Sequence, residues 1–212
     1  MTNFSTQALP IVILAAGSSR RMRGKDKLLE HVDGKPILRR QADIARAATK
    51  GPVYVTLPVD CPTRENALDG CDVNTVSVPN AHHGMSASLR QGLSMVPPDT
   101  RAVMILLADL PELSSADLIK VRDAVDLNGQ MLIWRGATSQ GKPGHPIVFA
   151  QSLFAELSRL SGDNGGAGVV ARHSNRMCLV PLPTERARRD LDTPEAWAEW
   201  RKQQAKNDAE TP

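Results

Sequence analysis

Aromatic residues are scarce in this sequence, at 3% of 212 residues. Few rings are therefore available to stack the bases of a single-stranded nucleic acid. Excess charge is scarce too, because the formal net charge is only +3. The chain lacks the broad basic field that DNA-binding proteins carry, so we expect no nucleic-acid partner.

Cysteines and long apolar runs are also few. Cys61, Cys71 and Cys178 match neither a zinc-binding pattern nor a redox pair. A chain of this length buries a core without disulfides, so we interpret them as reduced thiols in a cytoplasmic protein. The apolar run nearest the N-terminus, residues 9–16, is too short to span a bilayer and has no basic segment before it. We expect neither a signal peptide nor a membrane anchor.

What the chain does contain is an alternation of short apolar runs with longer amphipathic segments, which is typical of β–α units feeding a mostly parallel sheet. The expected strands are residues 9–15, 53–57, 73–78, 102–108, 131–134, 146–149 and 178–182. The expected helices are residues 36–49, 62–68, 85–96 and 151–160, with two more starting at Ser114 and Pro194. The sequence therefore predicts an α/β fold.

Neither an internal repeat nor an interdomain linker interrupts this pattern, so we expect one domain over residues 1–206. Residues 207–212 are polar and are expected to form a disordered tail. Two polar stretches rich in glycine, residues 135–144 and 162–168, are expected to be irregular. Asp117, three residues after Ser114, predicts a capping box, and the spacing of Trp197 and Trp200 predicts packing of the last helix.

The strongest local signal follows the first predicted strand. It consists of Leu14, Ala15, Ala16, Gly17, Ser18, Ser19, Arg20, Arg21 and Met22, with Lys27 further on. Small residues let backbone N–H groups approach phosphate oxygens, and Arg21 and Lys27 can neutralise their charge. The pattern is neither a Walker loop nor a dinucleotide fingerprint. The loop alone leaves two interpretations open, a triphosphate site or a solvated basic strand exit.

Asp109 directly follows the buried strand predicted at residues 102–108. Ligands bind beyond the carboxyl ends of parallel strands, so this carboxylate is expected to face the same crevice as Gly17. A carboxylate there suits Mg²⁺, which takes its other ligands from phosphate and water. The alternative is an ordinary turn aspartate before Pro111.

Further polar turns could reach the same face. Residues 82–88 lead into a helix, and their N–H groups and hydroxyls could hold a base or ribose, although a plain N-cap is the alternative. Residues 144–146 and 162–166 could bind an acceptor or serve as ordinary turns. At the start of the last helix, Asp192 or Thr193 could cap, and Asp192 could be a second metal ligand. His31 and His173 are interpreted as surface or hydrogen-bonded polar residues.

Taken in order, these segments resemble the MobA-like NTP transferases, most closely the molybdenum cofactor cytidylyltransferases. The resemblance covers about residues 10–200 and rests on Leu14-Ala15-Ala16-Gly17, Ser19, Arg21-Met22, Lys27, Gly84-Met85-Ser86-Ala87-Ser88-Leu89, Ala108-Asp109-Leu110-Pro111, Gly144-His145-Pro146, Gly162-Asp163 and Asp190-Leu191-Asp192-Thr193-Pro194. It implies a Rossmann-like, open and mostly parallel sheet with helices on both faces.

The resemblance also implies a reaction in which the terminal phosphate of molybdopterin cofactor attacks the α-phosphorus of CTP and pyrophosphate leaves. It assigns nucleotide binding to Leu14, Ala15, Ala16, Gly17, Ser18, Ser19, Arg21, Lys27, Gly84, Ser88 and Asp109. Arg21, Lys27 and Asp109 would be catalytic, and Asp109 and Asp192 would hold Mg²⁺. His145, Asp163 and Gly166 would bind the acceptor. The Ala15-Ala16-Gly17 opening is similar to the cytidylyl branch of the family.

One departure from the family pattern leaves the phosphate-binding lysine open between Lys25 and Lys27, because Arg23 delays Gly24 by one position. We favour Lys27, since two leucines follow it. Two other functions are weighed. One is a nucleotidyltransferase acting on a sugar phosphate or another small phosphorylated acceptor, and the other is a non-catalytic protein that delivers cofactor to a molybdenum hydroxylase apoenzyme.

Overall fold

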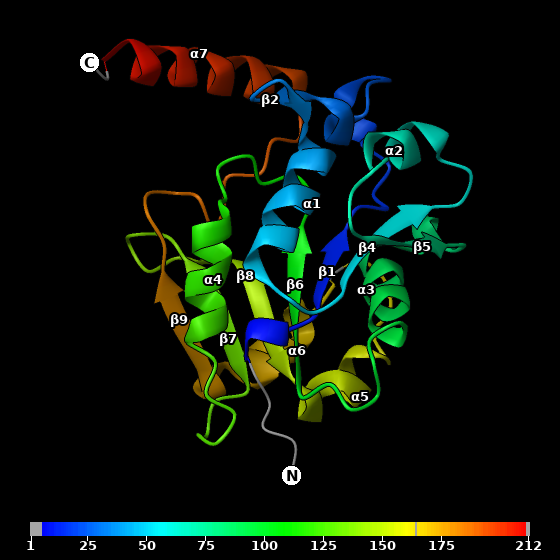
Figure 1. Ribbon diagram of the computed structural model, residues 1–212, viewed down its shortest axis with the longest axis vertical. Helices are drawn as coiled ribbons and strands as arrows, with labels where there is room; N and C mark the ends of the chain where they lie inside the picture. Colours follow the sequence, from blue (N-terminus) through cyan, green and yellow to red (C-terminus); the bar gives the residue numbers. More distant parts are fainter. Residues whose placement is uncertain (1–5, 164, 211–212) are drawn as a thin grey trace.

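The computed structural model describes residues 6–163 and 165–210, the last four by their backbone only. Its centre is a seven-stranded sheet of order β5-β4-β1-β6-β8-β7-β9 (Figure 1). The strands are β1 (Ile11–Leu14), β4 (Val53–Pro58), β5 (Asn74–Val78), β6 (Ala102–Leu107), β7 (Ile133–Ala137), β8 (Pro143–Ala150) and β9 (Met177–Pro181). Among the described strands of this sheet, β8 alone runs antiparallel to its neighbours, β6 and β7. The predicted mostly parallel α/β, Rossmann-like fold is confirmed.

Helices cover both faces of this sheet (Figure 1). One face carries α1 (Ile37–Ala48) and α4 (Ser115–Asp123), and the other carries α3 (Met85–Ser94), α5 (Phe154–Leu157) and α6 (Ala167–Arg172). Strand residues alternate between these layers, so Ile11 and Ile13 belong to the α1 and α4 core while Val12 belongs to the α3 core. The central strand β6 is buried on both faces, as its apolar run predicts.

Local sequence features determine where α4 begins and how closely α3 packs on the sheet. The capping box predicted for α4 is present, because Ser114 and Asp117 satisfy each other's backbone N–H groups. In α3, a Cβ on Gly92 would lie 2.4 Å from Cγ1 of Val12, so only glycine allows this close approach to β1. That contact packs the C-terminal half of α3 directly against β1.

The loop predicted at residues 135–144 is wrong at both ends, because it is shorter in the structure. Strand β7 continues to Ala137 and β8 begins at Pro143, so only residues 138–142 connect them. Arg135 stays in the strand because its Nε donates to the carbonyl of Gly144 at 2.7 Å. A second correction is α6, which begins inside the stretch expected to be irregular.

The remaining segments are short or peripheral. They comprise the hairpin β2 (His31–Val32) and β3 (Lys35–Pro36), helix α2 (Pro62–Ala67), and the 3-10 turns η1 (Thr6–Ala8), η2 (Arg20–Met22), η3 (Lys27–Leu29), η4 (Ala81–His83), η5 (Gln151–Leu153) and η6 (Ser174–Arg176). The helix predicted at residues 151–160 is thus split between η5 and α5. None of the helices in the described part of the chain has the length and apolarity needed to cross a membrane.

The last helix, α7 (Pro194–Glu210), extends away from the sheet (Figure 1). Thr193 caps it, since its Oγ1 accepts from the N–H of Ala196 at 3.2 Å. Trp197 and Trp200 are buried, which confirms their predicted packing. The tail predicted from residue 207 is corrected in part, because the helical backbone continues to Glu210; residues 211 and 212 lie outside the described residues.

Candidate active site

The site lies where the chain changes direction across the sheet. From β1 the chain crosses one face through α1 to β4, and it later crosses the other face through α3 to β6, so β4 and β6 flank β1. Loops leaving β1 and β6 therefore part at their carboxyl ends and leave a crevice, which is where ligands bind in open α/β sheets. A cleft of about 700 Å³ lies there, lined by both loops.

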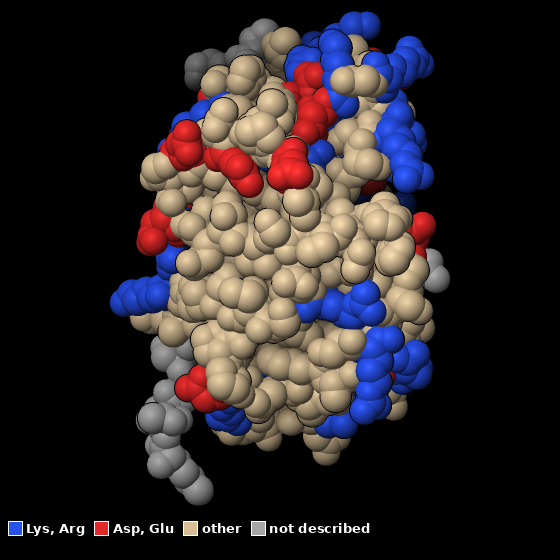
Figure 2. Space-filling view, turned by 90° about the vertical axis from the view of Figure 1, so that its right-hand side faces the viewer, with Lys and Arg blue, Asp and Glu red and all other residues tan. Residues whose placement is uncertain are grey.

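Basic side chains gather at this end of the molecule. Figure 2 shows Lys and Arg side chains, with some acidic ones beside them, toward the end at which the parallel strands terminate; a second group lies toward the opposite end, and few charges lie between them. Arg20 and Arg21 line the cleft and are exposed. This placement suits an anionic ligand of small size rather than an extended polyanion.

The loop after β1 leaves room for such a ligand. A Cβ added to Gly17 would meet no atom within 4 Å, so open cleft lies beside this backbone. Ser19, Arg23 and Gly24 all have positive φ, at 49°, 54° and 90°. The departure at Arg23 is thereby accommodated, because Arg23 takes the left-handed conformation and its side chain pairs with Glu195 at 2.7 Å.

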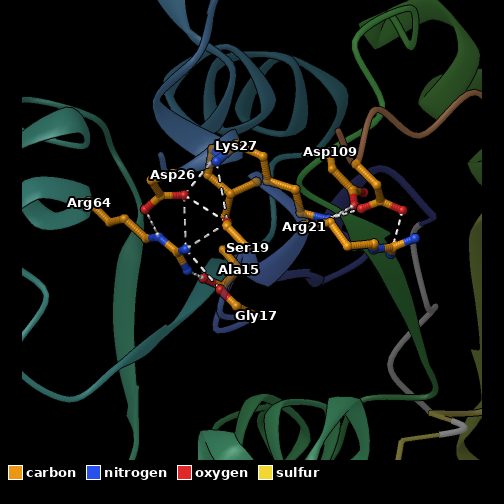
Figure 3. Close-up of polar contacts among 10 residues, drawn as sticks. Ala15, Gly17, Ser19, Arg21, Asp26, Lys27, Arg64 and Asp109 are labelled. Atoms are coloured by element: carbon orange, nitrogen blue, oxygen red, sulfur yellow. Dashed lines mark hydrogen bonds and ion pairs between the residues drawn. The ribbon is translucent and has the colours of Figure 1, made fainter. Parts of the chain in front are cut away.

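Arg64, from α2, lines the cleft and holds this loop by its carbonyl oxygens (Figure 3). Its guanidinium donates to the carbonyl oxygens of Ala15 and Gly17 and, through Nε at 2.6 Å, to Oδ2 of Asp26. Asp26 also accepts from Ser19 Oγ at 3.1 Å and from the N–H of Leu28 at 3.0 Å. Burial would raise the pKa of Asp26, but Arg64 outweighs it and lowers that pKa. These hydrogen bonds fix the conformation of the loop at the cleft.

Lys27 joins the two halves of the site. Its Nζ lies 2.5 Å from Oδ2 of Asp109 and 2.7 Å from Oδ1 of Asp192 (Figure 3). Arg21 pairs with the other oxygen of Asp192 at 2.6 Å. Burial would lower the pKa of Lys27, yet the two carboxylates outweigh it and raise that pKa, so the amine stays charged. Lys25 is exposed, and the geometry therefore favours Lys27 as the cation at the cleft.

The donor set of these residues fits a divalent cation. Oδ1 of Asp109 is buried and has no hydrogen-bond partner, which is unusual for a carboxylate oxygen. Asp109 and Asp192 offer the hard oxygen ligands that Mg²⁺ and Mn²⁺ take. Within the described residues no group of three or more His, Cys, Asp or Glu side chains is arranged for a metal. The remaining ligands would therefore come from phosphate and water.

The N-terminus of α3 forms the opposite wall. Gly84 and the buried Ser88 line the cleft, and Gly84 has a φ of 92°. A Cβ on Gly84 would lie 2.0 Å from Oδ1 of Asp163, and the N–H of Ser86 donates to the carbonyl of Gly162 at 3.2 Å. Glycine is thus required for the 162–163 turn to dock here, and that docking brings Asp163 into the cleft lining.

Most of the predicted site residues meet in this cleft. Those that line it are Leu14, Ala15, Ala16, Gly17, Ser18, Ser19, Arg21, Lys27, Gly84, Ser88, Asp109, Asp163 and Asp192. His145 and Gly166 do not. His145 lies on β8, where burial and the charge of Arg135 lower its pKa to about 4, and Gly166 packs against Phe149. Their assignment to the acceptor stays a prediction.

Sequence reasoning missed Arg64 and Asp26. Arg64 is only 3% exposed, yet nothing in the pattern around it distinguishes it from a solvated helix residue. The apolar wall was missed as well, and it includes Pro58, Val59, Val78, Pro79 and Cys61. Only the apolar wall could have been predicted from the sequence. Its residues lie at or just beyond the ends of two predicted strands, and the carboxyl ends of parallel strands meet at one edge of the sheet.

The geometry defines an α/β nucleotide-binding protein: a switch-point cleft, a loop of small residues open to it, two cations and two carboxylates. A family model described as the MobA-like NTP transferase domain matches residues 11–177. The chain belongs to this family.

The chain is similar to a probable molybdenum cofactor guanylyltransferase of Synechococcus elongatus, with 36% identity over 118 residues. That alignment covers 55% of this chain and 58% of the relative. It is also similar to the crystal structure of Rv0371c from Mycobacterium tuberculosis, with 27% identity, a TM-score of 0.78, and coverage of 92% of this chain and 98% of that one.

Two further structures, each solved with a bound ligand, are similar to this chain. Rv0371c in complex with manganese has 27% identity to this chain, a TM-score of 0.73, and coverage of 91% and 97% of the two chains. A CMP-2-keto-3-deoxy-manno-octonic acid synthetase complexed with CTP matches with a TM-score of 0.72 and coverage of 94% and 99%. Its identity is 14%, so it shows the shared fold alone.

Proposed function

We propose that this protein is a Mg²⁺-dependent nucleotidyltransferase that transfers CMP from CTP to the terminal phosphate of molybdopterin cofactor and releases pyrophosphate. The observation that carries the proposal is the 2.5 Å contact of Lys27 with Asp109, because it joins the loop after β1 to the loop after β6 in one cleft. Membership of the MobA-like family supports the same chemistry.

The cleft has the parts that a triphosphate needs. Backbone N–H groups around Gly17 would face the phosphate oxygens, and Arg21 and Lys27 would neutralise their charge. At the other wall, Gly84 and Ser88 would lie near the ribose and base. Asp109 and Asp192 would hold the divalent cation, which when bound withdraws charge from the α-phosphate.

The reaction then depends on positioning and charge. The acceptor phosphate oxygen attacks the α-phosphorus of CTP, a new P–O bond forms, and the bond to pyrophosphate breaks. The chain's own cations stabilise the charge that moves onto the leaving group, and the fixed loop holds the triphosphate in line for attack. A phosphate nucleophile is already ionised at neutral pH, so the proposal assigns no general base.

The choice of base has two candidates, each with one observation behind it. The Ala15-Ala16-Gly17 opening is similar to that of cytidylyltransferases and favours CTP. The name of the Synechococcus elongatus relative, a probable guanylyltransferase, favours GTP. Comparing kcat/KM for CTP, GTP and ATP decides between them, and we expect CTP to be preferred.

The test is pyrophosphate release by purified protein given molybdopterin cofactor, each nucleotide and Mg²⁺ or Mn²⁺. Mass spectrometry of the product identifies the acceptor, because CMP joined to a sugar phosphate or polyol phosphate has a different mass from CMP joined to the cofactor. Transfer of the product to a molybdenum hydroxylase apoenzyme tests the proposed receiving partner. Absence of pyrophosphate with every nucleotide and acceptor would contradict the proposal.

A further inference from the structure

We propose that Lys27 occupies the divalent-cation position of the ligand-free protein, so that the metal enters only together with a nucleoside triphosphate. The ammonium of Lys27 lies between Asp109 and Asp192, the two carboxylates that fit a metal. The site would therefore take the metal–nucleotide complex and bind the free ion weakly. This inference rests on the proposed function only in naming a nucleoside triphosphate as the ligand.

The contacts of Lys27 leave no room for both cations. Its Nζ lies 2.5 Å from Oδ2 of Asp109 and 2.7 Å from Oδ1 of Asp192. An ion bound by the same two oxygens would stand about 2.0–2.1 Å from each, as Mg²⁺ does in proteins. The ammonium and the ion would overlap, so one must leave before the other binds.

The side chain of Lys27 can move while its backbone stays in place. The N–H of Lys27 donates to Oγ of Ser19 at 3.3 Å, and Asp26 caps the turn η3 that Lys27 begins. Beyond this anchored backbone, the lysine has a flexible four-carbon stem, and its side chain is 17% exposed at the cleft wall. Rotation of the stem alone would carry the ammonium from the carboxylates toward a bound phosphate.

A triphosphate supplies what the exchange requires. Moving the ammonium off two carboxylates without a new anionic partner would leave an uncompensated charge in a half-buried site, which is costly. Phosphate oxygens give Lys27 that partner, and its departure frees Oδ2 of Asp109 and Oδ1 of Asp192 to accept the incoming ion. Nucleotide and metal would thus favour each other's binding, and by linkage each would raise the other's affinity by the same factor.

Direct Mn²⁺ titration by calorimetry or electron paramagnetic resonance tests this without turnover. For the unsubstituted protein, we expect an α,β-methylene analogue of CTP, or of GTP if GTP is the substrate, to lower the Kd for Mn²⁺ by about tenfold or more. For Lys27→Met without nucleotide, we expect a similar fall in Kd, because the internal cation is gone. Lys25→Met is the matched control, since Lys25 is exposed nearby and takes no part in these contacts; its Kd should stay unchanged.

The double variant Lys27→Met/Asp109→Asn locates the effect, because it should lose the gain in Mn²⁺ affinity. The inference is overturned if Lys27→Met binds Mn²⁺ no more tightly than the unsubstituted protein, or if the double variant keeps the gain. It is also overturned if the unsubstituted protein binds Mn²⁺ equally with and without nucleotide, a result that stands even where the variant fails to fold. Absence of pyrophosphate release together with coupled Mn²⁺ and nucleotide binding would sink the proposed function but not this inference.

Discussion

Asp26 and Lys27 are consecutive residues, yet they belong to two ion-pair networks with different properties. In the first, Asp26 accepts from Arg64, Ser19 and a backbone N–H, and Arg64 is 3% exposed. In the second, Lys27 lies at the cleft wall and Asp109 keeps a buried oxygen without a partner. The first network is complete without a ligand, and the second offers groups that a ligand would satisfy.

This difference indicates that the first network stabilises the fold of the site, whereas the second would bind the ligand. A complete buried network contributes to folding, because removing one member leaves another member charged and unpaired. An incomplete network at a cleft sacrifices some stability for ligand contacts, as functional sites do. Substitutions in the two networks are therefore expected to differ in whether stability or activity is lost.

The largest expected effect comes from Arg64→Met, which breaks the complete network. It leaves the half-buried Asp26 carboxylate without its cation and frees the carbonyls of Ala15 and Gly17, so we expect unfolding free energy to fall by about 3–5 kcal/mol. Urea denaturation measures this. Arg64→Lys keeps the positive charge but lacks the planar guanidinium, so its free energy of unfolding should fall by less. Arg159→Met, at an exposed position, is the control and should change little.

A second prediction concerns His145, a titratable side chain near the ligand-binding network that makes no contact with the cleft. Burial and Arg135 lower its pKa to about 4, so the folded protein holds this ring neutral. The unfolded chain binds a proton near pH 6.5, and the folded one does not until about pH 4. Stability is therefore complete above pH 6.5 and falls with acidification between these values, by about 3 kcal/mol at 1.4 kcal/mol per pKa unit.

Chemical denaturation at pH 7 and pH 4.5 measures that loss. His145→Gln removes the titrating ring, so the variant should show a flatter dependence of stability on pH. An identical pH dependence in both proteins would mean that folding does not shift the pKa of His145, and would contradict the prediction.

The third prediction breaks the second network at Asp109. Asp109→Asn removes a charge that would position the cation, and we expect kcat to fall by about a hundredfold or more, the scale of losing one preorganised charge stabiliser. Stability should fall much less than in Arg64→Met, because Lys27 keeps Asp192 as a partner. Asp99→Asn, at an exposed position away from the cleft, is the control. A rate loss below about tenfold would argue against a metal role for Asp109.

The sequence predicted the second network better than the first, for a physical reason. Arg21, Lys27 and Asp109 follow strand ends, and parallel strands bring their carboxyl ends to one edge, so topology places them together. Arg64 reaches its partners from a short helix 38 positions beyond Asp26, and neither periodicity nor a motif encodes that contact. The same holds for His145 and Gly166, whose turn-like sequences gave no measure of their distance from the cleft.

Strand ends were predicted least well where polar residues occupy a strand. Arg135 and Gly144 were interpreted as loop because charge and glycine are depleted in strands. Within the fold, Arg135 hydrogen-bonds across the β7–β8 pair, and Gly144 lets the carbonyl of Ala187 approach so closely that a Cβ would lie 2.1 Å from its oxygen. Tertiary contacts of this kind override local propensity.

The smallest expected effect is protection of Cys61 from alkylation, which reports nucleotide binding in the cleft independently of turnover. Cys61 lines the cleft, whereas Cys71 and Cys178 do not, and all three are free thiols. Nucleotide with Mg²⁺, at ten times its Kd, leaves the cleft empty about one-eleventh of the time, so alkylation of Cys61 should slow by about tenfold. Peptide mass spectrometry follows each thiol separately, and Cys71 and Cys178 serve as internal controls.

The same measurement sharpens the contrast between the networks. In Asp109→Asn, nucleotide should still protect Cys61 to a large extent, because the cations around Gly17 still hold phosphate, although kcat is greatly reduced. Arg64→Met should lose protection at the same nucleotide concentration, because the loop that presents those N–H groups is no longer fixed. Equal protection in both variants, at temperatures where both are folded, would mean that Arg64 stabilises the fold without shaping the nucleotide loop.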